Sequence, residues 1–438
     1  MKKLIYIISV LTLFVKISNA QDFIEVSMNQ SIKLGIKNRN NIKADSLNVL
    51  IYKSIVKEKQ KYILPDLSLK GNLTYYGDRE KTTVPAGLLG NTEPEKIKLG
   101  TNNNTCGALD LNYTLYKPGL YTDINIAKNN NALADEKLNQ TKCNIKHEIT
   151  KAYYEMALKK VQYEIMLQEE HRYKSYYELI KGKFENGAAL QNDFDQATLD
   201  YKNASINTQK SKQLYELSCI NLKYKMNIPA NTNVEFTDSI ESLKNLNNMP
   251  MSKNLIADRT EIKQLVIENK GNRLQLMRAK ENYLPTITFF ANYSQYFQSN
   301  YFDYSNSFNW SPVNYVGIQV SIPIMQTIKN HELVKQSKLK IAQTNELISQ
   351  ETNDIQNEIT SASIELQNAE LNEQTSMINY NLAQSIYDRQ KQQFQIGTLQ
   401  YQDLLNTEKS IHNAQQNYIS SAYDLLLAKL KYEIAGGR

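Results

Sequence analysis

Hydrophobic and polar positions follow two different periods along this chain. Over residues 119–228 and 324–438, apolar side chains recur every seven positions, as in the stripe of Ile341, Ile348 and Ile355. Both stretches lack proline, and glycine is rare in them. A seven-residue period without helix breakers predicts long helices with narrow seams of the coiled-coil kind. We therefore expect helical hairpins over residues 119–228 and 327–435.

A period of two replaces the period of seven in four shorter segments. Leu67, Leu69 and Leu73 alternate with polar residues, and the same alternation recurs further along the chain. It predicts strands over residues 66–77, 105–117, 285–298 and 313–325, with polar loops at 78–104 and 298–312. Strands that are apolar on one face and polar on the other are typical of membrane barrels. An ordinary half-buried antiparallel sheet has the same alternation.

Aromatic residues favour the membrane interpretation. Eleven of them fall within residues 289–315, and rings of this kind gather where lipid meets water. We expect a membrane-interface belt of Tyr75, Tyr113, Phe289, Tyr293, Phe297, Trp310 and Tyr315. Four strands cannot close a barrel, and an open strand edge is unstable in hydrocarbon. The chain must then oligomerise; three copies would supply twelve strands, although the sequence alone does not fix the number.

The sequence contains an internal duplication. The segment from Phe184 through Gly187 to Asp193 matches the segment from Phe394 through Gly397 to Asp403, 210 residues later. Glycine supplies the left-handed residue that ends a helix, and aspartate suits the first turn of the next helix. We assign a first repeat to residues 21–228, a linker to 229–254 and a second repeat to 255–438. Each repeat begins with a helix, at about 26–62 and 255–282, which precedes its two strands and its helical hairpin.

The N-terminus predicts export. Lys2 and Lys3 precede an apolar run over residues 4–15, and Ala20 ends a small-residue cleavage site. This pattern is typical of a signal peptide over residues 1–20, cleaved after Ala20. Its removal takes away three lysines and no acids, so the formal charge falls from +6 to +3, which does not indicate nucleic-acid binding. The run is too short to span a bilayer as a helix.

Composition argues against an enzyme. The 438 residues are 41% hydrophobic and 22% charged, and the three cysteines stand far apart. The four histidines have neither metal-ligand nor catalytic-triad spacing. We therefore expect no catalytic residue, no cofactor and no metal site.

Taken together, the signal peptide, the duplicated strand and helix pairs, and the two Phe–Gly–Asp turns resemble the TolC family of outer-membrane efflux proteins. The resemblance covers residues 21–438. It implies an α+β membrane protein, a homotrimer with a twelve-stranded barrel in the outer membrane and a periplasmic α-helical tunnel. It also implies docking to a periplasmic adaptor protein and an inner-membrane pump of the RND or ABC type. Substrates would pass through without chemical change.

The resemblance assigns roles to the helical turns. Acidic residues ring the closed periplasmic end in this family; the first falls on Asp403, and Asn406 stands in place of the second. Asp403 either lines this gate or only stabilises the start of its helix, the role that we also expect for Asp193 in the first repeat. Adaptor docking is expected at Asn186, Gly187, Ala188, Ile396, Gly397 and Thr398.

Two questions stay open at this level. A periplasmic coiled-coil adaptor or scaffold without membrane insertion would share the helices and the signal peptide, but it would not need two-faced strands or an aromatic belt. Within the channel interpretation, multidrug efflux, metal-ion efflux and type I protein secretion are equally compatible with the sequence.

Overall fold

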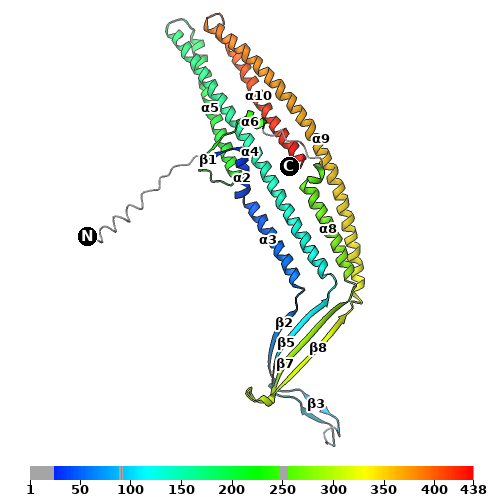
Figure 1. The fold of residues 1–438 in the computed structure, drawn as a ribbon. Coiled ribbons are helices and arrows are strands. Elements are labelled where there is room, and N and C mark those ends of the chain that lie inside the picture. The colour runs from blue at the N-terminus through cyan, green and yellow to red at the C-terminus, as the bar shows by residue number, and fades with distance from the viewer. Residues whose placement is uncertain (1–23, 88–89, 91, 246–254, 438) are drawn as a thin grey trace, which may run out of the picture. The chain divides into compact units, whose positions relative to one another are not determined.

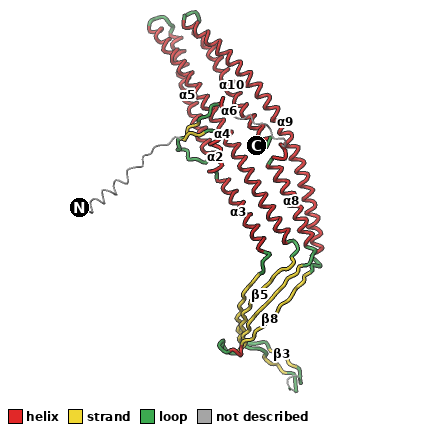
Figure 2. The backbone as a smooth tube through the Cα atoms, viewed as in Figure 1, coloured by secondary structure: helices red, strands yellow, loops and turns green. Residues whose placement is uncertain are grey.

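The computed structural model describes residues 24–87, 90, 92–245 and 255–437 (Figure 1). The expected signal peptide and its cleavage site lie outside these residues. Helices make up most of the described chain, and the strands gather in one sheet and two short pairs (Figure 2).

The chain forms two compact units, and each unit combines segments from both sequence repeats. The first unit contains Met1–Leu47, Glu136–Gln264 and Ser349–Arg438. The second unit contains Asn48–Asp135 and Leu265–Ile348. The repeats are therefore interleaved in space and do not form one compact body each.

Long helices occupy the two ranges in which the sequence predicts hairpins. These are α4 (Leu120–Glu185) with α5 (Gln191–Lys225), and α9 (Gln326–Gln395) with α10 (Tyr401–Ala435). The seven-residue stripes and the lack of proline explain their length. Within the part of the chain that the structure describes, no helix is both long and apolar enough to cross a membrane.

The helix expected over 26–62 is two helices, α2 (Met28–Asn38) and α3 (Asn40–Lys61). Arg39 separates them with an extended backbone, and its Nη2 lies 3.1 Å from Oε2 of Glu148. In the second repeat α7 (Leu255–Asp258) and α8 (Thr260–Glu281) replace the expected helix 255–282, and Arg259 separates them. Arginine is a good helix former, so the arginines themselves do not predict these breaks; each of them pairs with a glutamate far along the chain.

The duplication extends to individual contacts in the first unit. Arg259 Nη2 lies 3.0 Å from Glu358 Oε2, the counterpart of the pair between Arg39 and Glu148. The ends of α5 and α10 also correspond, because Asn227 and Gly437 follow them with positive φ of 54° and 78°. Such residues end helices because they turn the following amides back onto the last helical carbonyl groups, as Asn227 does to Tyr224 at 3.0 Å and Gly437 to Ile434 at 2.9 Å.

The second unit contains a four-stranded antiparallel sheet in the order β2-β5-β7-β8. Its strands are β2 (Asp66–Tyr75), β5 (Asn103–Tyr116), β7 (Thr286–Ser299) and β8 (Trp310–Ser321). They overlap the four predicted ranges; β8 begins three residues earlier and ends four residues earlier than expected. The central pair, β5 with β7, joins the two repeats, and β2 and β8 form the edges.

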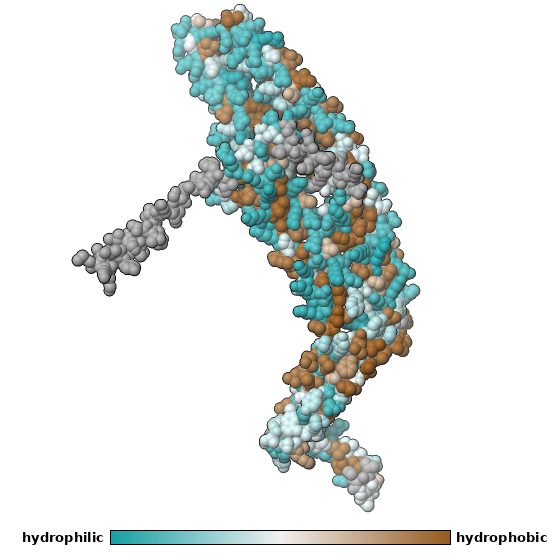
Figure 3. All heavy atoms as spheres, viewed as in Figure 1, coloured by the Kyte–Doolittle hydropathy of each residue, from teal (hydrophilic) through white to brown (hydrophobic). Residues whose placement is uncertain are grey.

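The pairing register separates the sheet into two chemically different faces. Leu69, Leu109 and Tyr293 lie in one row of what we call the apolar face. Asp110 and Asn292 lie in a row of the polar face. On the apolar face Leu67, Leu69, Val316, Ile318 and Val320 are 57 to 82% exposed. Figure 3 shows hydrophobic residues gathered over this part of the chain.

Six of the seven expected belt residues share the apolar face. They are Tyr75, Tyr113, Phe289, Tyr293, Phe297 and Trp310. Tyr315 pairs with Asn292 and therefore lies on the polar face, where its ring is 6.1 Å from that of Phe290. Phe290 interrupts the alternation of its strand, and the register places it opposite Gly317. An added Cβ at Gly317 would lie 2.5 Å from the Phe290 ring, so glycine makes room for it.

Two segments expected to be loops contain regular structure. The range 78–104 includes a hairpin of β3 (Lys81–Val84) and β4 (Glu95–Lys98). The linker 229–254 includes β6 (Val234–Phe236), which pairs in parallel with β1 (Ile24–Val26), and α6 (Ile240–Asn245). These elements are three to six residues long, too short to show a period in the sequence.

The core of the first unit surrounds α4. Ile149, Tyr153, Tyr154 and Met156 are fully buried there, together with Leu426 from α10. Tyr153 donates a hydrogen bond to the carbonyl oxygen of Val26 at 3.2 Å, so β1 is held against α4. Burial holds the pKa of the Tyr153 hydroxyl well above its ordinary value, so this hydroxyl stays a donor at any pH near neutrality.

Candidate functional site

The two helical turns have the same geometry. Gly187 and Gly397 adopt positive φ of 72° and 81°. The amide of Gly187 donates to the Phe184 oxygen at 2.9 Å, and that of Gly397 donates to the Phe394 oxygen at 3.1 Å. The next amide, of Ala188 or Thr398, donates five residues back at 2.7 and 2.9 Å. This pattern satisfies carbonyl groups at the end of α4 and α9 and explains glycine in both motifs.

The residues expected to dock a partner are exposed at these turns. Asn186, Ala188, Ile396 and Thr398 all face solvent, and Ile396 is 75% exposed. Asn186 Nδ2 donates to the Gly182 oxygen at 2.8 Å, and Thr398 Oγ1 donates to the Gln393 oxygen at 3.0 Å. The polar side chains thus close each turn, while the apolar Ile396 has no such local role.

Asp403 and Asn406 lie one helical turn apart on α10, and both are exposed. Asp403 is in the first turn of α10, and Asp193 is in the first turn of α5, where it is half-buried. Both positions complement the positive end of the helix dipole. The structure therefore supports a helix-start role for both aspartates and leaves Asp403 open to solvent as well.

A buried polar cluster lies close to these turns, between α4 and the second hairpin. Glu408 of α10 has a side chain only 1% exposed, and its Oε2 lies 3.1 Å from Arg172 Nε. Tyr176 donates to Glu408 Oε1 at 3.1 Å, and its hydroxyl lies 3.0 Å from that of Tyr387 on α9. These bonds satisfy a buried carboxylate, which would otherwise be costly.

Two further groups extend this cluster. His412 Nδ1 of α10 lies 2.9 Å from Glu169 Oε2 of α4. The bond to Glu169 raises the pKa of His412 above its ordinary value, against the opposing effect of burial. Burial, assisted by the charge of Glu408, raises the pKa of Tyr387 to about 12. The first and second hairpins are thus joined by charged and hydroxyl groups and not by apolar packing alone.

With this geometry in view, we compared the chain with known proteins. The family described as outer membrane efflux protein matches residues 31–224 and 251–431, which leaves out only the N-terminus, the linker and the last residues. The chain belongs to the outer membrane efflux protein family. The first matched range falls in the first sequence repeat, and the second begins at the end of the linker and covers most of the second repeat. No curated protein gives a match.

Solved structures of outer membrane channels share the fold of this efflux protein. The CmeC channel of Campylobacter jejuni has a TM-score of 0.74 at 16% identity, over 94% of this chain and 85% of CmeC. The MtrE channel of Neisseria gonorrhoeae, in its open state, has a TM-score of 0.75 at 13% identity, over 94% of this chain and 88% of MtrE. VceC of Vibrio cholerae has a TM-score of 0.72 at 15% identity, over 94% of this chain and 96% of VceC. Identities this low show a common fold only.

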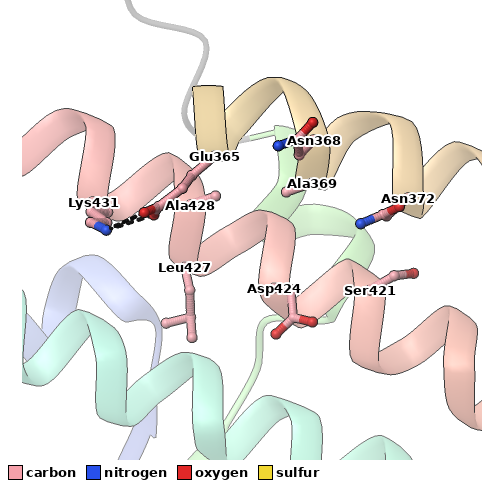
Figure 4. A pocket seen from close by; sticks show the side chains of 9 residues that line it. All are labelled: Glu365, Asn368, Ala369, Asn372, Ser421, Asp424, Leu427, Ala428 and Lys431. Atoms are coloured by element: carbon pink, nitrogen blue, oxygen red, sulfur yellow. Dashed lines mark hydrogen bonds and ion pairs between the residues drawn. The ribbon is translucent and has the colours of Figure 1, made fainter. Parts of the chain in front are cut away.

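A groove lies between α9 and α10 of this efflux protein, with a volume of about 310 Å³ (Figure 4). Small side chains at Ala369, Ser421 and Ala428 leave the space, and Lys431 lies 2.6 Å from Glu365 at its rim. Within the described residues, no three His, Cys, Asp or Glu side chains are arranged to hold a metal ion. The groove is therefore lined by both polar and apolar side chains.

The sequence pattern alone did not single out the cluster around Glu408 in this efflux protein. The sequence does contain one indication of this cluster. Leu404, Glu408 and Ile411 are spaced to share one helix face, and the two apolar residues are buried. An acid at an apolar seam position is a marker for a buried polar contact.

Proposed function

We propose that this protein is the exit duct of a tripartite efflux system in the outer membrane. Three copies would place their sheets edge to edge in a twelve-stranded barrel, and their hairpins would form a periplasmic helical tunnel. The observation that carries the proposal is the sheet itself, which has one apolar face, one polar face and edges at β2 and β8. Lipid suits the apolar face, water suits the polar face, and neighbouring copies remove the edges.

The polar face is chemically suited to a water-filled passage. Lys70 Nζ lies 2.8 Å from Asp110 Oδ2, and Asn292 Nδ2 donates to Asp110 Oδ1 at 2.6 Å. These groups span β2, β5 and β7, so charged and amide side chains cover the middle of this face. Such groups would be costly against acyl chains.

The helices of the first unit support assembly independently of the sheet. Tyr176 of α4 packs with Leu404 of α10, so α5 and α9 lie on the outer sides of the two hairpins (Figure 1). Each carries an exposed apolar stripe on one face. The stripe on α5 contains Leu199, Ile206, Leu214, Leu217, Ile220 and Tyr224, and the stripe on α9 contains Ile364, Leu371, Ile378, Leu382 and Ile386.

The charges along these two helices are complementary. Residues 201–225 of α5 contain five lysines and one acid. Residues 349–388 of α9 contain seven acids and neither lysine nor arginine. Contact between α5 of one copy and α9 of the next would bury both stripes and pair opposite charges. An interface between two different surfaces generates a ring when its rotation closes.

We assign the exposed turns around Gly187 and Gly397 to docking of a periplasmic adaptor protein, which in turn engages an inner-membrane pump of the RND or ABC type. Ile396 supports this assignment because it is apolar, exposed and not required by the turn. We assign Asp403 to the closed periplasmic end, with Asn406 beside it. The cargo is a drug, a metal ion or a secreted protein, and the helical wall suits all three.

Native mass spectrometry of the detergent-solubilised protein tests the assembly, and ion conductance in planar bilayers tests the duct. We expect a three-copy mass and stable conducting events. A protein that carbonate washes from membranes and that stays monomeric would instead be the periplasmic scaffold considered from the sequence.

A further inference from the structure

The connection between β7 and β8, residues 300–309, folds back over the apolar face of the sheet. Phe297 lies on that face, and the ring of Tyr304 covers it with centroids 4.3 Å apart. The ring of Trp310, the first residue of β8, also contacts Phe297, and the two ring centroids are 5.4 Å apart. Phe297 is completely buried as a result, although Leu69 and Val316 on the same face are 82 and 73% exposed. We call residues 300–309 the aromatic flap.

Hydrogen bonds fix the flap across the strands. Trp310 Nε1 donates to the Tyr304 carbonyl oxygen at 2.9 Å, and the Tyr304 hydroxyl lies 3.1 Å from Thr105 Oγ1 on β5. Asn300 Oδ1 accepts a bond from the Asn102 amide at 3.1 Å. Phe302 stacks on Tyr75 of β2 with centroids 5.7 Å apart. The flap therefore touches residues of all four strands on a single face.

The outer surface of the flap is aromatic. Tyr301, Phe302 and Phe308 are 78, 64 and 91% exposed. Three exposed aromatic rings on one short segment are unfavourable in water, because each ring gains free energy when its large apolar area is covered.

The number of charged residues distinguishes the β7–β8 connection from the β2–β5 connection at the same end of the sheet. Between Thr286 and Ile328 the chain has no lysine or arginine and one acid, Asp303. The connection between β2 and β5, residues 77–102, has eight charged residues and forms the β3–β4 hairpin. Charged residues favour water, whereas uncharged aromatic residues favour the boundary between lipid headgroups and acyl chains.

We propose that the aromatic flap lies in that boundary layer of the membrane, on the lipid side of the sheet, with Tyr301, Phe302 and Phe308 inserted among the lipids. The occupant of this surface is membrane lipid, because the flap continues the apolar face and Asp303 is its single charged residue. The inference rests on the proposed function, in which the apolar face meets lipid. It adds that a connecting segment, and not only the strands, sets the depth of the sheet in the bilayer.

Trp310 is the single tryptophan, so its replacement gives a background in which one introduced tryptophan reports alone. In a Trp310→Phe background, one tryptophan is placed in the flap (Phe308→Trp), in the sheet (Val316→Trp) or in the charged hairpin (Thr83→Trp). Val316 is 73% exposed on the apolar face. Each variant is reconstituted in phosphatidylcholine vesicles whose acyl chains carry bromine either near the headgroup or near the chain end. Circular dichroism confirms folding, and Tyr301→Trp replaces Phe308→Trp if the latter does not fold.

We expect bromine near the headgroup to lower the flap fluorescence at least about twofold, with a smaller effect from bromine near the chain end. The sheet reporter should also be quenched, and the hairpin reporter should not. If the sheet reporter is quenched but the flap reporter is not, the inference is overturned and the proposed function stays intact. A sheet reporter that escapes quenching would contradict the proposed function itself.

Discussion

Arg259 and Glu358 form an ion pair in which Nη2 and Oε2 lie 3.0 Å apart, and the arginine side chain is 9% exposed. Arg39 and Glu148 repeat this pair in the first half of the chain, with an arginine side chain 17% exposed. Both arginines interrupt helices. The duplicated chain thus offers the same interaction twice in different surroundings.

This relationship predicts unequal effects of the same substitution. Arg259→Met leaves Glu358 without this partner and also removes the bond from Arg259 Nε to Glu261 at 3.2 Å, so we expect a loss of about 2 to 3 kcal/mol in unfolding free energy. Arg39→Met leaves Glu148 paired with Lys225 at 3.2 Å, and we expect a loss of about 1 kcal/mol or less. Denaturant unfolding followed by circular dichroism measures both. Equal losses would show that the additional contacts of Arg259 contribute nothing.

The turn glycines predict opposite effects of alanine at neighbouring positions. Gly187→Ala and Gly397→Ala force a side chain into positive φ and should destabilise by about 1 kcal/mol each. Gly182 lies inside α4, so Gly182→Ala should stabilise by about 0.5 to 1 kcal/mol. An added Cβ meets open space at all three glycines, so only the backbone differs. A destabilised Gly182→Ala would contradict this explanation.

His412 predicts a stability contribution that depends on pH. Its pKa is raised because Glu169 accepts a bond from the protonated ring, while Arg172 and Glu408 also face it with opposing effects. The stabilisation is therefore complete below the unfolded pKa of about 6.5 and is lost as pH rises through the higher folded pKa. The difference in melting temperature between wild type and His412→Gln should shrink from about pH 6 to about pH 8. The exposed His171, replaced by Gln, is the matched control; a difference that grows with pH would contradict the assignment.

The gate assignment predicts a change in cation block. Asp403→Ala should weaken block by added multivalent cations in planar-bilayer recordings by about tenfold, or about 1.4 kcal/mol, because one ring of carboxylates is lost. Asn406→Asp adds a second ring one turn away and should strengthen the block. Asp193→Ala, at the same place in the other hairpin, should leave it unchanged. Unaltered block in Asp403→Ala would leave only the helix-start role.

The docking assignment predicts loss of transport without loss of assembly. Ala188→Lys or Thr398→Lys places a long charged side chain on an exposed turn, so accumulation of a fluorescent efflux dye in cells should rise to the level of a strain without the duct. Native mass spectrometry should still give three copies. Ala188→Ser and Thr398→Ser keep the side chains small and should transport normally. Dye export by the lysine variants would remove these positions from the interface.

Much of the fold could be predicted because its periods are strong. Seven-residue stripes gave the four long helices, and alternation gave the four sheet strands within a few residues. The break at Arg39 could not be found this way, because the apolar period does not mark it and arginine is a good helix former. The hairpin of β3 and β4 was missed because four residues per strand carry too little alternation.

The site was predicted unevenly for a similar reason. Gly187 and Gly397 were found because their turn needs a particular backbone, which constrains residue type directly. The partners of Glu408 come from α4 and α9, far away in sequence, so spacing alone could not join them. The face of Tyr315 was missed because the residue was assigned to the belt by its aromatic ring, although its position in the strand alternates with the apolar Val316 and Ile318.

The pairing of β5 with β7 has a consequence for how the molecule is made. Asn103 lies opposite Ser299, so the centre of the sheet joins positions almost two hundred residues apart. A chain synthesised from its N-terminus completes the β2–β5 pair at Tyr116, whereas β7 begins only at Thr286. Such distant contacts slow folding, and the waiting ribbon needs protection from other chains during that delay. A fragment cut at the linker would lack part of both compact units and would not amount to half a protein.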